Sequence, residues 1–304
     1  MTDTGLEYWD QTLERARQPG GAVRRLLADP RFADVLRAAA RGALHEFDTK
    51  TALNTVFLDY GTFSLGFLAL YLHAIGGITH RRLAELSGRS TILSRGRASA
   101  MLGMMRVKGL VARHTDMSGQ VIYRPSDNLV RFFRDRFRVE FNAVALVEPR
   151  VEQMLAHWDE PGTFERYLAM FGMQWVTAGA NDLQEFVPFR KILSRRAGML
   201  IVYAMMDAAD YGRSTTPLRS FPLSVSALAR RFRVSRSQVL RVLREVEGAG
   251  FVSLDTAKGE AAFTPRFYEQ YLTYSAVVYF YVINFSHQFL MSYMPAETGR
   301  VATR

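Results

Sequence analysis

Hydrophobic and polar positions between residues 224 and 265 change from helical to strand spacing in a fixed order. Ser224 is a suitable N-cap, because its hydroxyl can accept a hydrogen bond from a free amide in the first turn of a helix. The inward-facing residues of this short helix would be Ala227, Leu228 and Phe232. Arg233 and Val234 follow as a tight turn. The segment therefore predicts a short amphipathic helix that ends in a sharp change of direction.

A second, longer helix is predicted from Ser235, which is another N-cap candidate, to about Gly248. Its apolar stripe consists of Val239, Val242, Leu243 and Val246. The polar face carries side chains that can hydrogen-bond to base edges or phosphates in a major groove, namely Ser235, Arg236, Ser237, Gln238, Arg241 and Arg244. One buried stripe and one free face are what a DNA-reading helix requires.

Two short strands are predicted after Gly250, at residues 251–254 and 260–264, with a turn at residues 255–259 between them. Lys258 is the basic residue of that turn. Helix, tight turn, capped helix and hairpin in this order are typical of a winged helix-turn-helix, in which the hairpin is the wing. An amphipathic helical hairpin with a solvated arginine face is the plainer alternative, but the complete order favours the winged module.

The same order recurs at residues 80–125. Leu83, Ala84 and Leu86 would face inward from the first helix, and Met101, Leu102 and Met105 from the second. Gly109 precedes this hairpin as Gly250 precedes the later one, at an offset of 141 residues. The strands of this wing would carry Arg113, His114 and Arg124, which can follow a phosphate backbone or enter a minor groove. An ordinary solvated hairpin is the alternative for these three residues.

Two N-caps compete for the second helix of this earlier copy. Counting forward from the first helix places Ser90 opposite Ser235, whereas counting back from Gly109 places Ser94 there. About one helical turn separates the two candidates. The helix is therefore either capped at Ser90 and one turn longer, or capped at Ser94 after a longer turn. The candidate DNA contacts are accordingly Ser90, Thr91, Ser94, Arg95 and Arg97.

Similarity between the two parts of the chain extends beyond these segments, which indicates a tandem duplication. Residues that match at a constant offset of 132 are Phe32 and Phe164, Leu36 and Leu168, Phe57 and Phe189, Gly66 and Gly198, Leu68 and Leu200, and Tyr71 and Tyr203. The predicted fold is mainly α with small β-hairpins, in two tandem winged helix-turn-helix domains that are each flanked by scaffold helices. The predicted segments are an N-terminal segment at 1–19, a first half at 20–148 with its winged module at about 65–125, a second half at 149–294 with its module at about 197–265, and a tail at 295–304.

Composition narrows the class of protein. The chain has 304 residues, of which 48% are hydrophobic, so each half is long enough to bury its own core. The absence of cysteine excludes disulfides and thiolate metal sites, and the polar start has no signal-peptide pattern. Residues 272–291 are apolar, but Asn284, His287 and Gln288 interrupt them, which favours a buried or interface helix over a membrane span. We expect a cytoplasmic, nucleoid-associated protein with no membrane partner.

The charge pattern points to a polyanionic partner. The net charge is +10, and arginines crowd the two winged segments, as on a surface that neutralises phosphates. The six histidines show no metal-ligand spacing, and neither a glycine-rich phosphate loop nor a nucleophile motif is present. These observations argue against an enzyme and predict neither a cofactor nor a metal.

Each half resembles a subunit of the MarR family of bacterial transcriptional regulators, with leading and closing helices around a central winged helix. Because members of that family are homodimers, the resemblance implies a monomeric single-chain pseudodimer here, with further self-association left open. It also implies a pocket between the scaffold and the winged module, and therefore room for a small-molecule effector that we do not identify. The wings depart from the family pattern, since its acidic-x-Arg motif reads Asp116-Met117-Ser118 in the first copy and the second copy offers only Lys258.

Two non-identical recognition helices would read an asymmetric double-stranded DNA site. The sequence therefore predicts a sequence-specific DNA-binding transcriptional regulator. A plasmid-type replication initiator with tandem winged helices and a winged-helix scaffold for protein interactions are the alternatives. Base reading would depend most on the second module, which has the clearer recognition helix, and wing anchoring on the first, which has the better-charged hairpin.

Overall fold

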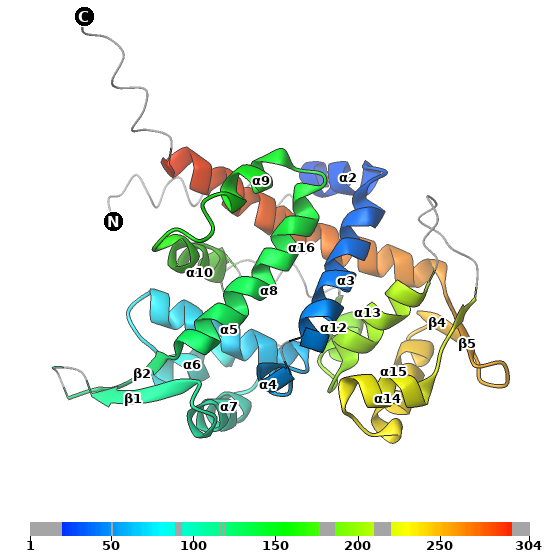
Figure 1. Ribbon diagram of the computed structural model, residues 1–304, viewed down its shortest axis with the longest axis horizontal. Coiled ribbons are helices and arrows are strands. Elements are labelled where there is room, and N and C mark those ends of the chain that lie inside the picture. Colours follow the sequence, from blue (N-terminus) through cyan, green and yellow to red (C-terminus); the bar gives the residue numbers. More distant parts are fainter. Residues whose placement is uncertain are drawn as a thin grey trace, which may run out of the picture.

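The computed structural model describes residues 20–49, 51–88, 93–115, 117, 119–174, 176, 186–209 and 220–293. Helices dominate the described chain, and its strands form two small antiparallel sheets (Figure 1). The prediction of a mainly α fold with small β-hairpins is therefore confirmed. Among the described helices, none combines the length and apolar character that crossing a bilayer requires.

The elements fall into two series along the chain. The first series is α2 (Gly20–Ala28), α3 (Phe32–Thr49), α4 (Thr51–Asn54), α5 (Tyr60–Ala74), α6 (His80–Ser87), α7 (Arg95–Val107), β1 (Val111–Thr115), β2 (Val121–Pro125) and α8 (Asp127–Ala145). The second series is α9 (Pro149–Leu155), α10 (Thr163–Gln174), α12 (Val187–Leu193), α13 (Gly198–Ala208), β3 (Phe221–Pro222), α14 (Val225–Phe232), α15 (Arg236–Gly248), β4 (Val252–Asp255), β5 (Glu260–Phe263) and α16 (Pro265–Tyr293).

The order of helices and strands recurs between the two series. Two helices and an antiparallel hairpin follow one another as α6, α7, β1 and β2, and again as α14, α15, β4 and β5. The short strand β3 adds to the second hairpin by pairing with β5. Ile78 makes the corresponding bridge to Tyr123 on β2 of the first hairpin. We call these two segments the first and second helix–hairpin units.

Local signals in the sequence account for most boundaries of the second unit. The hydroxyl of Ser224 accepts from the amide of Ala227 and begins α14, and that of Ser235 accepts from the amide of Gln238 and begins α15. Arg233 adopts the left-handed backbone conformation, with φ of 53°, and this produces the tight turn between the helices. All three features follow the prediction, because caps and turns depend on residues that are neighbours in sequence.

One inward-facing residue of α14 was predicted wrongly. Ala227 is exposed, whereas Ala229 is buried together with Leu228 and Phe232. Because α14 begins at Val225, the buried stripe follows positions one and four residues beyond Leu228, and Ala227 lies on the other side of the helix. Phe221 begins the short strand β3 before this unit, and residues 210–219 lie outside the described residues.

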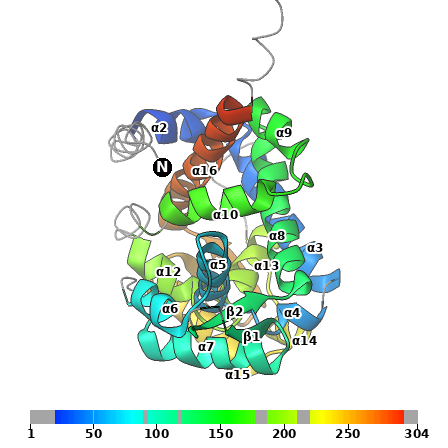
Figure 2. The same cartoon turned by 90° about the vertical axis from the view of Figure 1, so that its left-hand side faces the viewer.

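The two halves of the chain interlock. The leading helix α3 packs against α13 of the other half, and α10 packs against α5 in the reciprocal manner. The closing helices repeat this exchange, since α8 packs against α9 and α16 packs against α2 (Figures 1 and 2). The buried side chains accordingly form one continuous core through both halves. Although each half is long enough to bury a core of its own, the buried side chains of the two halves pack together.

Specific contacts hold this exchange in place. Gly172 of α10 lies against the ring of Tyr71 on α5 so closely that a Cβ at position 172 would fall 2.3 Å from a ring carbon. In the reciprocal contact, Nε of Arg41 on α3 lies 2.7 Å from a carboxylate oxygen of Asp207 on α13. A close backbone approach thus joins α10 to α5, and a charge pair joins α3 to α13.

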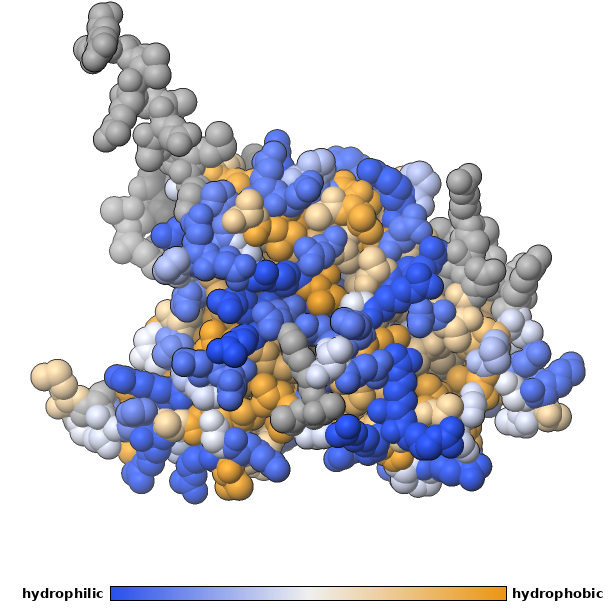
Figure 3. Space-filling view, in the orientation of Figure 1, coloured by the Kyte–Doolittle hydropathy of each residue, from blue (hydrophilic) through white to orange (hydrophobic). Residues whose placement is uncertain are grey.

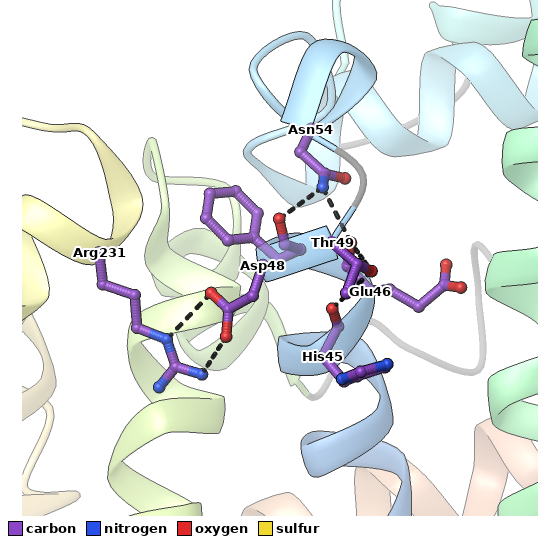
Figure 4. A network of polar contacts seen from close by, with 7 residues as sticks. His45, Glu46, Asp48, Thr49, Asn54 and Arg231 are labelled. Carbon is purple, nitrogen blue, oxygen red and sulfur yellow. Dashed lines mark hydrogen bonds and ion pairs between the residues drawn. The ribbon is translucent and has the colours of Figure 1, made fainter.

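A polar network at the end of α3 reaches the second unit (Figure 4). The guanidinium of Arg231 on α14 donates to both carboxylate oxygens of Asp48, at 3.3 and 2.8 Å. Asn54 donates to the carbonyls of Glu46 and Phe47 in the last turn of α3. The C-terminal end of α3 therefore serves as a docking point for α14.

Candidate nucleic-acid interface

The helices α7 and α15 lie along the same edge of the molecule, which is the lower edge in both Figure 1 and Figure 2. The hairpin β1–β2 extends at one end of the long axis and the hairpin β4–β5 at the other. Hydrophilic side chains line much of this edge in the space-filling view (Figure 3). We call α7, α15 and the two hairpins together the candidate interface.

The start of α7 resolves which serine caps it. Ser94 has extended backbone angles, and its hydroxyl accepts a hydrogen bond from the amide of Arg97. The helix therefore begins after Ser94 and not after Ser90. Ser90 and Thr91, the other two predicted contacts at this end, lie outside the described residues.

The helix α15 presents three exposed arginines. Arg236, Arg241 and Arg244 are exposed on α15, and none of them forms an ion pair with another described residue. The buried residues of α15 are Val239, Val242, Leu243 and Val246. The arginines therefore lie on the opposite side of the helix. The structure thus places these predicted contact residues at the surface.

The short polar residues of α15 have neighbours within the protein. The hydroxyls of Ser235 and Ser237 lie 2.9 Å apart. The amide nitrogen of the Gln238 side chain donates to the carbonyl of Arg196, which lies just before α13. Gln238 therefore helps to seat α15 on α13, and a contact with a base would require it to give up this hydrogen bond.

Two predicted contacts of α7 differ in their surroundings. Arg95 is exposed at the first position of the helix. Arg97 instead reaches across to α5, where its Nη2 lies 2.5 Å from a carboxylate oxygen of Asp59. Asp59 is also the N-cap of α5, and its side chain is 11% exposed. Arg97 therefore joins α7 to α5 and is not a free surface arginine.

The basic residues of the first hairpin lie on both of its faces. Arg124 is opposite Ala112, and Arg113 is opposite Tyr123. Because neighbouring residues on a strand point to opposite faces, His114 shares a face with Arg124, and Arg113 lies on the other. All three side chains are exposed, and none makes an ion pair with another described residue. The hairpin β1–β2 therefore carries basic residues on both faces.

The second hairpin has a different charge balance. The ammonium of Lys258 lies 3.2 Å from a carboxylate oxygen of Asp255 across the turn, and its amide donates to the same side chain. Glu260 begins the following strand and accepts from the hydroxyl of Ser220. The charge of Lys258 is thus balanced by Asp255, and the hairpin β4–β5 attracts anions less than the hairpin β1–β2 does.

Two exposed arginines near α15 were not among the predicted contacts. Arg233 occupies the turn before α15 in a backbone conformation that favours glycine, and Arg196 lies at the point where Gln238 docks. Both side chains are exposed. The turn was visible in the sequence, but the position of Arg196 beside α15 follows only from the packing of α13 against that helix.

Chemically, the candidate interface offers guanidinium donors in two clusters, one on each helix–hairpin unit. Such donors bind phosphates and base edges. In the part of the chain that the structure describes, no three His, Asp or Glu side chains gather closely enough to hold a metal ion. Comparison of the chain with models of protein families, with curated proteins and with solved structures finds no match.

Proposed function

We propose that this chain is a sequence-specific transcriptional regulator that binds double-stranded DNA through two tandem winged helix-turn-helix modules. The recognition helices would be α7 and α15, and the wings would be the hairpins β1–β2 and β4–β5. In this proposal the duplicated halves form a pseudodimer within one polypeptide. The interlocked packing of α3 with α13 and of α10 with α5 supports it, because the two modules are then held at a set separation.

The observation that carries the proposal is the position of α7 and α15 on one edge, with exposed arginines on both helices. Two helices on opposite faces could not reach one duplex, whereas two on the same edge can enter successive major grooves. The centres of their half-sites should then lie roughly 10 bp apart, or a multiple of that distance. The flanking positions of the two hairpins are suited to contacts with the backbone on either side.

The two helices would read different sequences. In α15 the exposed donors are Arg236, Arg241 and Arg244, whereas α7 exposes Arg95 and commits Arg97 to Asp59. The preferred site should therefore be asymmetric, unlike the palindrome that a homodimer favours. Binding should weaken steeply with salt, because several guanidinium groups would displace counterions from phosphates.

Selection of bound fragments from a genomic library tests the proposal, with wild type compared with two variants. Arg236→Ala combined with Arg241→Ala should remove base preference at one end of the selected motif, and Arg95→Ala at the other end. The control combines Arg25→Ala and Arg166→Ala, which remove exposed arginines from α2 and α10, away from the candidate interface. If the selected DNA motif is unchanged in both interface variants, the proposal that α7 and α15 both read base sequence is overturned.

The same selection separates regulation from replication initiation. A single short site upstream of a gene is expected for a regulator, whereas an array of direct repeats would indicate an initiator. Salt-independent binding, or the absence of any selected motif, would favour a protein-interaction scaffold instead.

A further inference from the structure

A cavity of about 140 Å³ lies where the two halves meet, between α5 and α8 of the first half and α13 and α16 of the second. Its wall is largely aromatic and includes Tyr60, Phe67, Phe137, Phe171, Tyr203 and Tyr274. This size resembles that of an engineered apolar cavity that admits benzene. The space is therefore sufficient for a single aromatic ring.

A buried ion pair forms one polar side of this cavity. Nη2 of Arg136 lies 2.6 Å from Oε1 of Glu140, one helical turn further along α8. The hydroxyl of Tyr279 on α16 donates to Oε2 of the same carboxylate, at 2.9 Å. Both oxygens of Glu140 are therefore engaged, and its charge is balanced by that of Arg136.

One donor of this group lacks a partner. Nη1 of Arg136 is buried and has no hydrogen-bond partner among the described residues, and the residue as a whole is 8% exposed. A buried donor without an acceptor costs free energy, and a guanidinium donor costs more than a neutral one. Since Arg136 lines the cavity, an acceptor placed there would satisfy this nitrogen.

The tyrosines around the pair remain uncharged. Burial raises the pKa of the Tyr203 and Tyr279 hydroxyls, and the negative charge of Glu140 raises both further. The nearby Arg136 partly offsets this effect on Tyr203. The pKa of Arg136 is itself raised, because the attraction of Glu140 outweighs the opposing effect of burial. The charged residues that line the cavity therefore form a neutral pair at physiological pH.

We propose that this cavity is a binding site for an uncharged, single-ring aromatic molecule whose oxygen accepts a hydrogen bond from Nη1 of Arg136. The ring would pack against the aromatic wall, where edge-to-face contacts are favourable. An anionic ring is disfavoured, because Arg136 already neutralises Glu140 and a second carboxylate would add an uncompensated buried charge. The site belongs to the scaffold and takes its wall from both halves, so one chain contains one such site.

Calorimetric titration of the full-length protein with three matched probes tests this inference. Acetophenone has a ring and a carbonyl acceptor, α-methylstyrene has the same shape without the acceptor, and benzoate carries a negative charge. Acetophenone should bind about tenfold more tightly than either of the others, since a buried hydrogen bond from a charged donor accounts for a difference of that order. Equal affinity for acetophenone and α-methylstyrene, or tighter binding of benzoate, would overturn the proposal.

Two variants locate the binding. Val278→Phe places a ring in the cavity, so it should abolish binding of all three probes. Arg136→Met combined with Glu140→Leu removes both charges together, which avoids leaving one of them buried alone. This double variant should bind acetophenone and α-methylstyrene equally, and circular dichroism confirms that it is folded. Retention of the acetophenone preference in the double variant, or of binding in Val278→Phe, would show that the probes bind elsewhere. Because the readout is ligand binding itself, the result does not depend on whether the protein binds DNA.

Discussion

The two helix–hairpin units share their backbone plan and differ in the side chains around it. The helices α7 and α15 begin in the same way, after Ser94 and Ser235. Residues 88–94 separate α6 from α7, however, whereas only residues 233–235 separate α14 from α15. In the first unit, Arg97 of α7 pairs with Asp59 of the scaffold, and the hairpin is basic. In the second unit, the arginines of α15 are exposed, and Lys258 of the hairpin pairs with Asp255. The same helix caps and buried apolar positions thus maintain the backbone arrangement in both units, while the charged residues at the surface differ.

The largest difference in stability should arise at the ends of α6 and α14. Phe232 is fully buried, with its ring 5.4 Å from that of Phe47, whereas the corresponding Ser87 donates a hydrogen bond to the carbonyl of Leu83. Phe232→Ala should lower the free energy of unfolding by about 3–5 kcal/mol through the cavity that it leaves. Ser87→Ala should cost about 1 kcal/mol. Urea denaturation measures both, and equal losses would contradict the larger contribution that we assign to Phe232.

The next largest effect concerns DNA affinity. Arg236→Ala combined with Arg241→Ala should weaken binding by about 100-fold, and Arg95→Ala by about tenfold, because each base-contacting arginine accounts for about 1–3 kcal/mol. Fluorescence anisotropy with the selected site, at one fixed salt concentration, measures this difference. The variant with Arg25→Ala and Arg166→Ala controls for net charge. If Arg95→Ala is as damaging as the double change, the second unit does not dominate base reading.

A smaller contrast is expected between the two wings. Arg113→Ala combined with Arg124→Ala should weaken binding by about tenfold and reduce the salt dependence by about two counterions, as the loss of two phosphate contacts predicts. Lys258→Ala should change affinity by less than about twofold, since Asp255 already pairs with that ammonium and exposed pairs contribute little. Titrations across a range of salt concentrations measure both slopes. An equal reduction in the two variants would show that both wings contact the backbone.

Two ion pairs between the units and the scaffold should differ in strength. Arg97→Ala leaves the mostly buried carboxylate of Asp59 without its partner and should cost about 1–3 kcal/mol of stability. Arg231→Ala removes a more exposed pair with Asp48 and should cost at most about 1 kcal/mol. Adding Asp59→Asn to the first variant should recover part of its loss. Should Arg97→Ala instead leave stability intact and abolish DNA binding, Arg97 would be a DNA contact after all.

The smallest expected effect is at the tight turn of the second unit. Arg233→Gly should raise stability by roughly 0.5–1 kcal/mol, because glycine adopts the left-handed conformation without the cost that other residues incur. Arg233→Ala removes the same charge and keeps the strain, so it should not stabilise the protein. If both variants reduce DNA affinity equally, the guanidinium is a contact, and if neither does, Arg233 serves the turn alone.

The sequence alone determined the local features of both units. The caps at Ser224 and Ser235, the buried stripe of α15 and the hairpin after Gly250 all depend on residues within a few positions of one another. Hydrophobic period and capping chemistry therefore suffice to place them. The sequence does not determine where α7 begins, because Ser90 and Ser94 are equally suitable as N-caps.

Only the tertiary structure decided how the units are joined and which side chains remain free. Arg97 forms an ion pair with Asp59, and Arg231 forms one with Asp48, which is distant in sequence. The Gln238 side chain donates a hydrogen bond to the carbonyl of Arg196. The exchange of helices between halves and the cavity at their junction arise in the same way, from contacts between segments that are distant in sequence. Periodicity shows which face of a helix is buried, but not against which partner, since any apolar face of suitable shape satisfies the same pattern.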